Sequence, residues 1–133
     1  MLLRIVISSF IALATTSHAG MALEPVKTAR DLHLACGQAY DGFENIIYEP
    51  IERSVLIAQC YSFVTATSQL LKAGTYSYEG QAKWQCTNIP DELGELSDTY
   101  VEWIARNQMQ SKTPAAVAFV MAIENKYPCG GTD

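Results

Sequence analysis

Four cysteines constrain the fold of this chain more than any other feature of its sequence. They are widely spaced, with no Cys-x-x-Cys or His-x-x-x-His pattern, so their spacing argues against a metal site. An even number of cysteines in an exported chain predicts disulfides, and four cysteines allow three pairings. We expect Cys36–Cys60 and Cys86–Cys129, because each of these bonds would join neighbouring helices.

The amino-terminal residues 1–19 have the pattern of a cleaved signal peptide. Arg4 supplies a positive charge, residues 5–14 are apolar apart from Ser8 and Ser9, and Ser17-x-Ala19 offers small residues to a signal peptidase. The apolar run is about half of the ~20 residues that a membrane-spanning helix needs. The sequence therefore predicts export from the cytoplasm, cleavage after Ala19, no membrane insertion afterwards, and one helical domain over residues 20–133.

Apolar periodicity predicts an all-α fold, a compact bundle of four to five helices with two disulfides. Thr28 is a good N-cap for a helix over residues 29–40, which Asp41-Gly42 would end. Pro50 suits the first position of a second helix that continues over residues 51–72 and stops at Gly74.

Two further helices are predicted in the second half of the chain. Pro90 opens the third, which continues to Arg106, and Gly94 within it suggests a point of close packing. Thr113-Pro114 provides an N-cap and a first-turn proline for the fourth helix, whose apolar residues 115–123 predict burial. We expect the tail, residues 130–133, to be loose.

The formal net charge of −5 limits the classes of partner. The basic residues are scattered, with no basic stretch that would bind nucleic acid. An acidic domain favours a basic protein partner, because complementary fields accelerate encounter.

No set of residues indicates catalysis. The one histidine beyond the leader, His33, has no flagged nucleophile, and we expect it at the surface or its boundary. Acidic residues cluster near two predicted helix starts, where the helix dipole accounts for them: Glu44, Glu49 and Glu52, then Asp91, Glu92, Glu95 and Asp98. We therefore expect no enzyme activity, no cofactor and no metal.

A polar and aromatic loop over residues 75–83 is the best candidate for partner binding. Tyr76 and Tyr78 offer large, rigid contact areas, and Glu79 lies beside them. The alternative, which the sequence weighs about equally, is that one or both tyrosines pack back onto the core.

The order of the motifs resembles the Rap/Tai-type immunity proteins of bacterial type VI secretion. The resemblance covers nearly all of residues 20–133 and rests on Cys36 in a first helix, Cys60-Tyr61-Ser62-Phe63-Val64, Cys86-Thr87-Asn88-Ile89-Pro90 and Tyr127-Pro128-Cys129. It implies a small periplasmic helical protein that binds a secreted peptidoglycan amidase and blocks its active cleft. It also implies a homodimer, as is common among members.

Three classes of function follow from these observations. The first is an immunity protein that occludes a cell-wall amidase, with Tyr76, Tyr78 and Glu79 at the contact. The second is a small periplasmic stress chaperone or other helical binding protein, which as a chaperone would loosen and expose apolar surface at low pH. An enzyme is the third.

Overall fold

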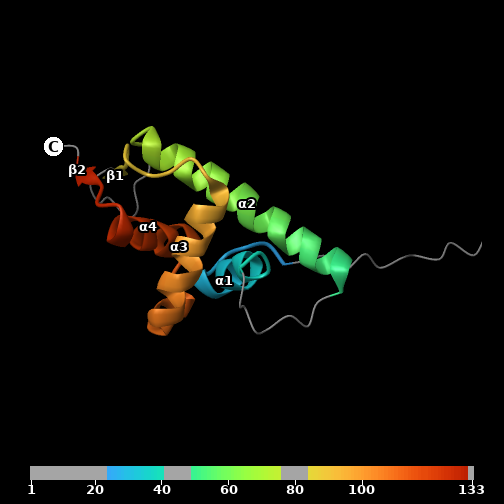
Figure 1. The fold of residues 1–133 in the computed structure, drawn as a ribbon. Coiled ribbons are helices and arrows are strands. Elements are labelled where there is room, and N and C mark those ends of the chain that lie inside the picture. The colour runs from blue at the N-terminus through green and yellow to red at the C-terminus, as the bar shows by residue number, and fades with distance from the viewer. Residues whose placement is uncertain (1–23, 41–48, 76–83, 132–133) are drawn as a thin grey trace, which may run out of the picture.

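The computed structural model describes residues 24–40, 49–75 and 84–131, which form four α-helices and three short elements (Figure 1). The α-helices are α1 (Ala29–Gly37), α2 (Pro50–Lys72), α3 (Leu93–Arg106) and α4 (Ala115–Lys126). A 3-10 helix, η1 (Gln108–Lys112), joins α3 to α4, and two-residue strands β1 (Trp84–Gln85) and β2 (Gly130–Gly131) pair antiparallel. The predicted all-α bundle is confirmed.

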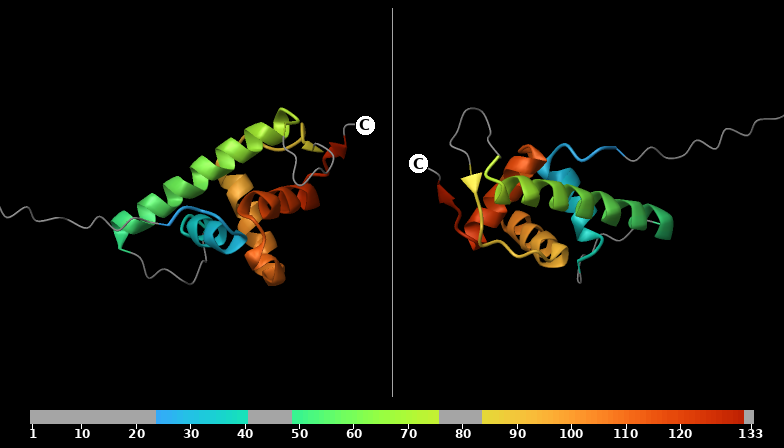
Figure 2. Two further views of the ribbon diagram at one scale, coloured as in Figure 1. Left: turned by 180° about the vertical axis from the view of Figure 1, so that it is seen from behind. Right: turned by 90° about the horizontal axis from the view of Figure 1, so that it is seen from above.

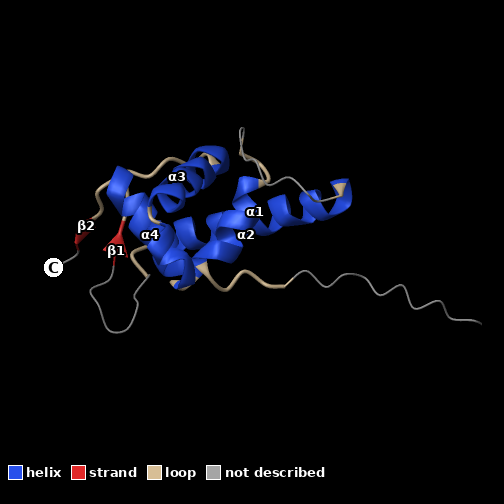
Figure 3. Ribbon diagram, turned by 90° about the horizontal axis from the view of Figure 1, so that it is seen from below, coloured by secondary structure: helices blue, strands red, loops and turns tan. Residues whose placement is uncertain are grey.

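The longest helix, α2, runs along one side of the molecule, and α1, α3 and α4 lie together on its other side (Figures 1 and 2). Its amino-terminal turns extend beyond the other helices. Its carboxyl-terminal end lies beside β1 and β2, which occupy one end of the molecule (Figure 3). The bundle therefore has a helical body and a small β ladder at one end.

Aromatic rings fill the centre of the core. Phe119 of α4 packs edge-to-face on Phe63 of α2, with 6.4 Å between ring centroids, and lies 6.1 Å from the ring of Tyr100. Tyr100 is fully buried, and its hydroxyl donates a 2.6 Å hydrogen bond to the Ala29 carbonyl. These contacts join all four helices around one point.

A capping box fixes the start of α1 at Thr28, the residue that the sequence predicts as its N-cap. The Thr28 hydroxyl accepts from the Asp31 amide at 3.3 Å, and the Asp31 carboxylate accepts from the Thr28 amide at 2.9 Å. Partial burial of Asp31 opposes ionisation, but the hydrogen bonds from the Thr28 backbone and side chain outweigh it and lower the pKa of Asp31. The start of α1 also pairs with the start of α4, through a 2.8 Å bond from the Ala29 amide to the Thr113 carbonyl.

The end of α1 differs from the prediction, because the helix stops at Gly37 and not at Tyr40. The Ala39 and Tyr40 amides instead form turn bonds to residues three positions back. The Gln38 carbonyl accepts two hydrogen bonds from Arg53 of α2, at 3.1 Å from Nε and 3.0 Å from Nη2. A contact from another helix therefore ends α1.

The beginning of α3 also differs, because the helix starts at Leu93 and not at Pro90. Asp91 forms an ion pair with Lys72 at the end of α2, and Ile89 is buried in the core. Both contacts keep the segment before Leu93 from adopting a helical conformation. Gly94 does not mark close packing, since a Cβ there would meet nothing within 4 Å.

Two smaller expectations at the carboxyl-terminal half need correction. Pro114, and not Thr113, is the N-cap of α4, and the Thr113 hydroxyl donates to the Gln110 side chain at 2.8 Å. Gly130–Gly131 is not loose, because it pairs with Trp84–Gln85. The fourth helix is mostly buried as predicted, although Met121 is 38% exposed.

Candidate protein-binding site

Two disulfides cross-link the bundle, and both pairings are the predicted ones. Cys36–Cys60 joins α1 to α2 with a Cα–Cα distance of 4.9 Å. Cys86–Cys129 joins the residue after β1 to the segment between α4 and β2, with a Cα–Cα distance of 4.5 Å. Such bonds form and persist in an oxidising compartment outside the cytoplasm.

The second disulfide belongs to a set of contacts that we call the loop base, formed by Leu71, Gly74, Gln85, Cys86 and Cys129. The Cys86 amide donates a 3.1 Å hydrogen bond to the Leu71 carbonyl at the end of α2. Gly74 has φ of 67°, and a Cβ built on it would lie 3.5 Å from the Gln85 side chain. The chain therefore leaves α2 and enters β1 at neighbouring points.

The pairing of β1 with β2 strengthens the loop base. Trp84 is opposite Gly131 and Gln85 is opposite Gly130, so the end of the chain is fastened beside the entry to β1. The cysteine pattern alone predicted the disulfide, but not this ladder. A strand made of two glycines has neither the alternation nor the β-branched residues by which strands are recognised in a sequence.

The residues predicted to contact a partner, Tyr76, Tyr78 and Glu79, lie outside the described residues. Their role stays a prediction. The structure describes the chain on either side of these residues, with Gly74 after α2 and Gln85 in β1.

Acidic side chains surround the first turns of α3, beside the loop base. Asp91 is exposed and ion-paired with Lys72, whose amine lowers the pKa of the Asp91 carboxyl by hydrogen bonding. Further along, the Tyr127 hydroxyl donates to the Glu95 carboxylate, and the Lys126 amine lies 4.0 Å from the same carboxylate. Hydrogen bonding to Tyr127 raises the pKa of Lys126.

The remaining candidate titratable groups occupy structural positions. His33 is half-buried on α1, as expected for a boundary residue, and desolvation lowers its pKa. Glu49 is the N-cap residue of α2 and Glu52 lies in its first turn, while Glu44 lies outside the described residues. Within the described ranges, no group of three or more His, Cys, Asp or Glu side chains is placed to hold a metal ion.

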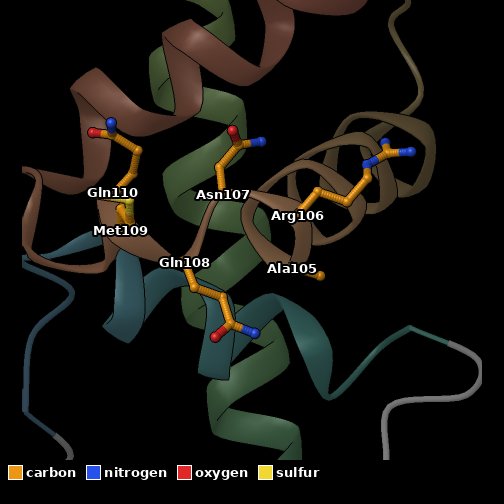
Figure 4. A pocket seen from close by; sticks show the side chains of 6 residues that line it. All are labelled: Ala105, Arg106, Asn107, Gln108, Met109 and Gln110. Carbon is orange, nitrogen blue, oxygen red and sulfur yellow. The ribbon is translucent and has the colours of Figure 1, made fainter.

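A shallow hollow of about 400 Å³ lies where α3 meets η1, and no pattern in the sequence had indicated it (Figure 4). Its lining residues are Ala105, Arg106, Asn107, Gln108, Met109 and Gln110. Figure 4 shows the Arg106, Asn107 and Gln108 side chains pointing in different directions, so their polar groups do not converge on one ligand. This hollow is not a candidate catalytic site.

The fold and its cross-links define a class of protein: a small all-α domain, cross-linked by two disulfides, with the loop base at one end. In the part of the chain that the structure describes, no helix has the length and apolar character needed to span a bilayer. The chain matches no protein-family model, and no curated protein or solved structure matches it significantly.

Proposed function

We propose that this chain is a periplasmic immunity protein that binds a secreted peptidoglycan amidase and blocks its active cleft. The observation that carries the proposal is the loop base, where a disulfide, a strand pair and a helix end hold both ends of one segment. That segment contains the two tyrosines and the glutamate that the sequence favours for partner contact.

A clamped loop base suits tight binding for an entropic reason. Ordering a loop on binding costs free energy, and fixing its ends beforehand lowers that cost. Tyrosine adds large contact area for few rotatable bonds. A loop of this kind, fastened to a cross-linked core, is a suitable device for occupying the cleft of an enzyme.

The surrounding charge supports a basic partner. The chain carries a formal net charge of −5, and exposed carboxylates such as Glu92 and Glu95 lie on the α3 side of the loop base. Complementary charge accelerates encounter and selects the partner more than it adds affinity. An amidase with a positively charged rim around its cleft fits this description.

The compartment in the proposal follows from two observations. The disulfides indicate an oxidising environment outside the cytoplasm. The predicted signal peptide, residues 1–19, lies outside the described residues and supplies the route of export.

The proposal is tested by measuring binding of the processed protein, residues 20–133, to a peptidoglycan amidase encoded beside its gene. We expect a dissociation constant near 1 nM, about −12 kcal/mol, as immunity requires. The double variant Tyr76→Ala/Tyr78→Ala should weaken binding at least about 100-fold, because two central aromatic contacts together are worth several kcal/mol.

A matched control is Gln108→Ala in η1, which is exposed and separate from the loop base. It should bind as the unaltered protein does. Equal affinity of the tyrosine variant and the control would contradict the placement of the contact in residues 75–83. Absence of binding below micromolar concentration would contradict the function itself.

A further inference from the structure

The two disulfides differ in how far solvent can reach them. The bond between Cys36 and Cys60 is enclosed at both ends, because Cys36 is 1% exposed and Cys60 is 0% exposed. Cys86 is also buried, at 2% exposed, but its partner Cys129 is partly exposed and follows the exposed Pro128. Of the four cysteines, Cys129 is therefore the one that an external reagent can approach in the folded protein.

The Cys36–Cys60 bond is also the one that the fold protects more firmly. Cys36 and Cys60 belong to the hydrophobic core and join α1 to α2. Because α1 also packs against α3 and α4, separating it from α2 disrupts the whole helical body. Opening this bond to solvent therefore requires a free energy close to that of global unfolding.

The segment that carries Cys129 is held by fewer contacts. The Tyr127 hydroxyl donates to the Glu95 carboxylate, and Gly130–Gly131 pairs with Trp84–Gln85 over two residues. This pairing lies at one end of the molecule, outside the helical body (Figure 3). A short ladder at the edge of a fold opens far more often than a helix pair in its core, so Cys86 and Cys129 become accessible without global unfolding.

We propose that Cys129 is a site of thiol–disulfide exchange, at which an external dithiol reduces Cys86–Cys129 while Cys36–Cys60 stays intact. The attacking thiolate approaches along the line of the sulfur–sulfur bond, so the attacked sulfur must be accessible from the side away from its partner. The partly exposed Cys129 satisfies this condition better than the buried Cys86. Exposed disulfides are in general the labile ones, whereas enclosed disulfides resist reduction.

The exchange proceeds in two balanced steps. A thiolate of the dithiol forms a mixed disulfide with Cys129 Sγ, and the bond to Cys86 breaks, leaving its electron pair on Cys86 Sγ, which takes a proton from water. The second thiol of the reductant then loses its proton and attacks the reductant sulfur of the mixed disulfide, so Cys129 leaves as a thiolate and is protonated. The dithiol is oxidised to a disulfide by two electrons, and Cys86 and Cys129 together gain two electrons.

Reduction should open the loop base and leave the helical body folded. The hydrogen bond from the Cys86 amide to the Leu71 carbonyl lies next to the broken disulfide. The helical body keeps Cys36–Cys60. An effect of reduction on amidase binding rests on the proposed function, but the exchange is measured without the amidase, so failure of one is distinguishable from failure of the other.

Timed reduction tests the selectivity. The oxidised protein, residues 20–133, is treated with dithiothreitol, free thiols are blocked with N-ethylmaleimide, and the labelled peptides are identified by mass spectrometry. Cys86 and Cys129 should be labelled at least about 100-fold faster than Cys36 and Cys60, because only local opening is required. In urea that unfolds the chain, the two rates should agree within about tenfold, because access no longer differs. Simultaneous labelling of all four cysteines in the folded protein, or a ratio that persists in urea, would overturn the proposal.

A monothiol tests which sulfur is attacked. After brief treatment with 2-mercaptoethanol and an acid quench, the mixed disulfide should be at least about ten times more abundant on Cys129 than on Cys86, because access decides which sulfur is attacked. Equal amounts on the two cysteines of the folded protein would overturn the assignment to Cys129.

Amide hydrogen exchange tests the structural consequence. After selective reduction, the Cys86 amide should exchange at least about tenfold faster, because its hydrogen bond belongs to the opened loop base. The Ala29 amide, which donates to the Thr113 carbonyl at 2.8 Å in the helical body, is the matched control and should be unchanged. Unchanged protection of the Cys86 amide, or equal loss at both amides, would overturn the local opening of the loop base.

Discussion

At the residue scale, the buried hydroxyl of Tyr100 links two helices that are far apart in the sequence. Tyr100 lies on α3, and its hydroxyl donates to the carbonyl of Ala29, the first residue of α1. Burial raises the pKa of Tyr100, with a further contribution from the Asp31 carboxylate, so the phenol stays neutral in the folded protein. No local pattern in the sequence identifies this acceptor, because 71 residues separate Tyr100 from Ala29.

Replacing Tyr100 by phenylalanine should therefore lower the free energy of unfolding. The buried Ala29 carbonyl would lose the hydrogen bond from Tyr100, at a cost of about 1–2 kcal/mol. Urea unfolding at pH 7 measures the loss. An unchanged free energy of unfolding would contradict the importance of this bond.

The same pair of proteins should differ in alkaline solution. The pKa of Tyr100 is raised above its unfolded value of about 10, so its contribution is complete below pH ~10 and is lost as the pH rises further. Stability of the unaltered protein should therefore fall more steeply above pH ~10 than that of Tyr100→Phe. Parallel pH profiles would show that ionisation of Tyr100 is not linked to unfolding.

At the element scale, the sequence predicted the helix interiors well and several helix ends badly. The apolar stripe of α2 and the continuous apolar run of α4 indicated the positions of these helices, because apolar residues must be buried. The ends of α1 and α3 depend on Arg53 and Lys72, side chains of α2 that bind Gln38 and Asp91. Such contacts join distant parts of the chain and leave no local signal.

Replacing two glycines by alanine should change the stability of the protein in opposite directions. Gly94 lies exposed in α3, and a Cβ added there would have no neighbour within 4 Å, so Gly94→Ala should stabilise the protein by about 0.5–1 kcal/mol. Gly74 has φ of 67° beside Gln85, so Gly74→Ala should destabilise it by about 1 kcal/mol. Thermal unfolding of both variants checks the signs, and a stabilising Gly74→Ala would contradict the described end of α2.

At the scale of the whole molecule, the two disulfides stabilise different parts of the fold. Cys36–Cys60 lies within the helical body and joins α1 to α2. Cys86–Cys129 lies at the end of the bundle and holds the loop base together with β1 and β2. The sequence predicted both bonds, but the loop base required the Leu71, Gly74 and Gln85 contacts that only the three-dimensional structure shows.

Removing the disulfides one at a time should show that both contribute to stability but only one contributes to binding. The bonds close loops of 24 and 43 residues, so Cys36→Ala/Cys60→Ala and Cys86→Ala/Cys129→Ala should lose about 3 and about 4 kcal/mol of unfolding free energy. Among molecules still folded, only the second variant should bind the amidase more weakly, because it releases the loop base. Equal affinity of the two folded variants for the amidase would contradict a role of the loop base in binding.

The proposed function, inhibition of a cell-wall amidase by binding, can be tested directly. The most direct measurement is peptidoglycan hydrolysis by the amidase encoded beside the gene, titrated with residues 20–133 in their oxidised form. We expect hydrolysis to fall to background at one inhibitor chain per enzyme. Full hydrolysis in the presence of a tenfold molar excess at micromolar concentration would contradict it.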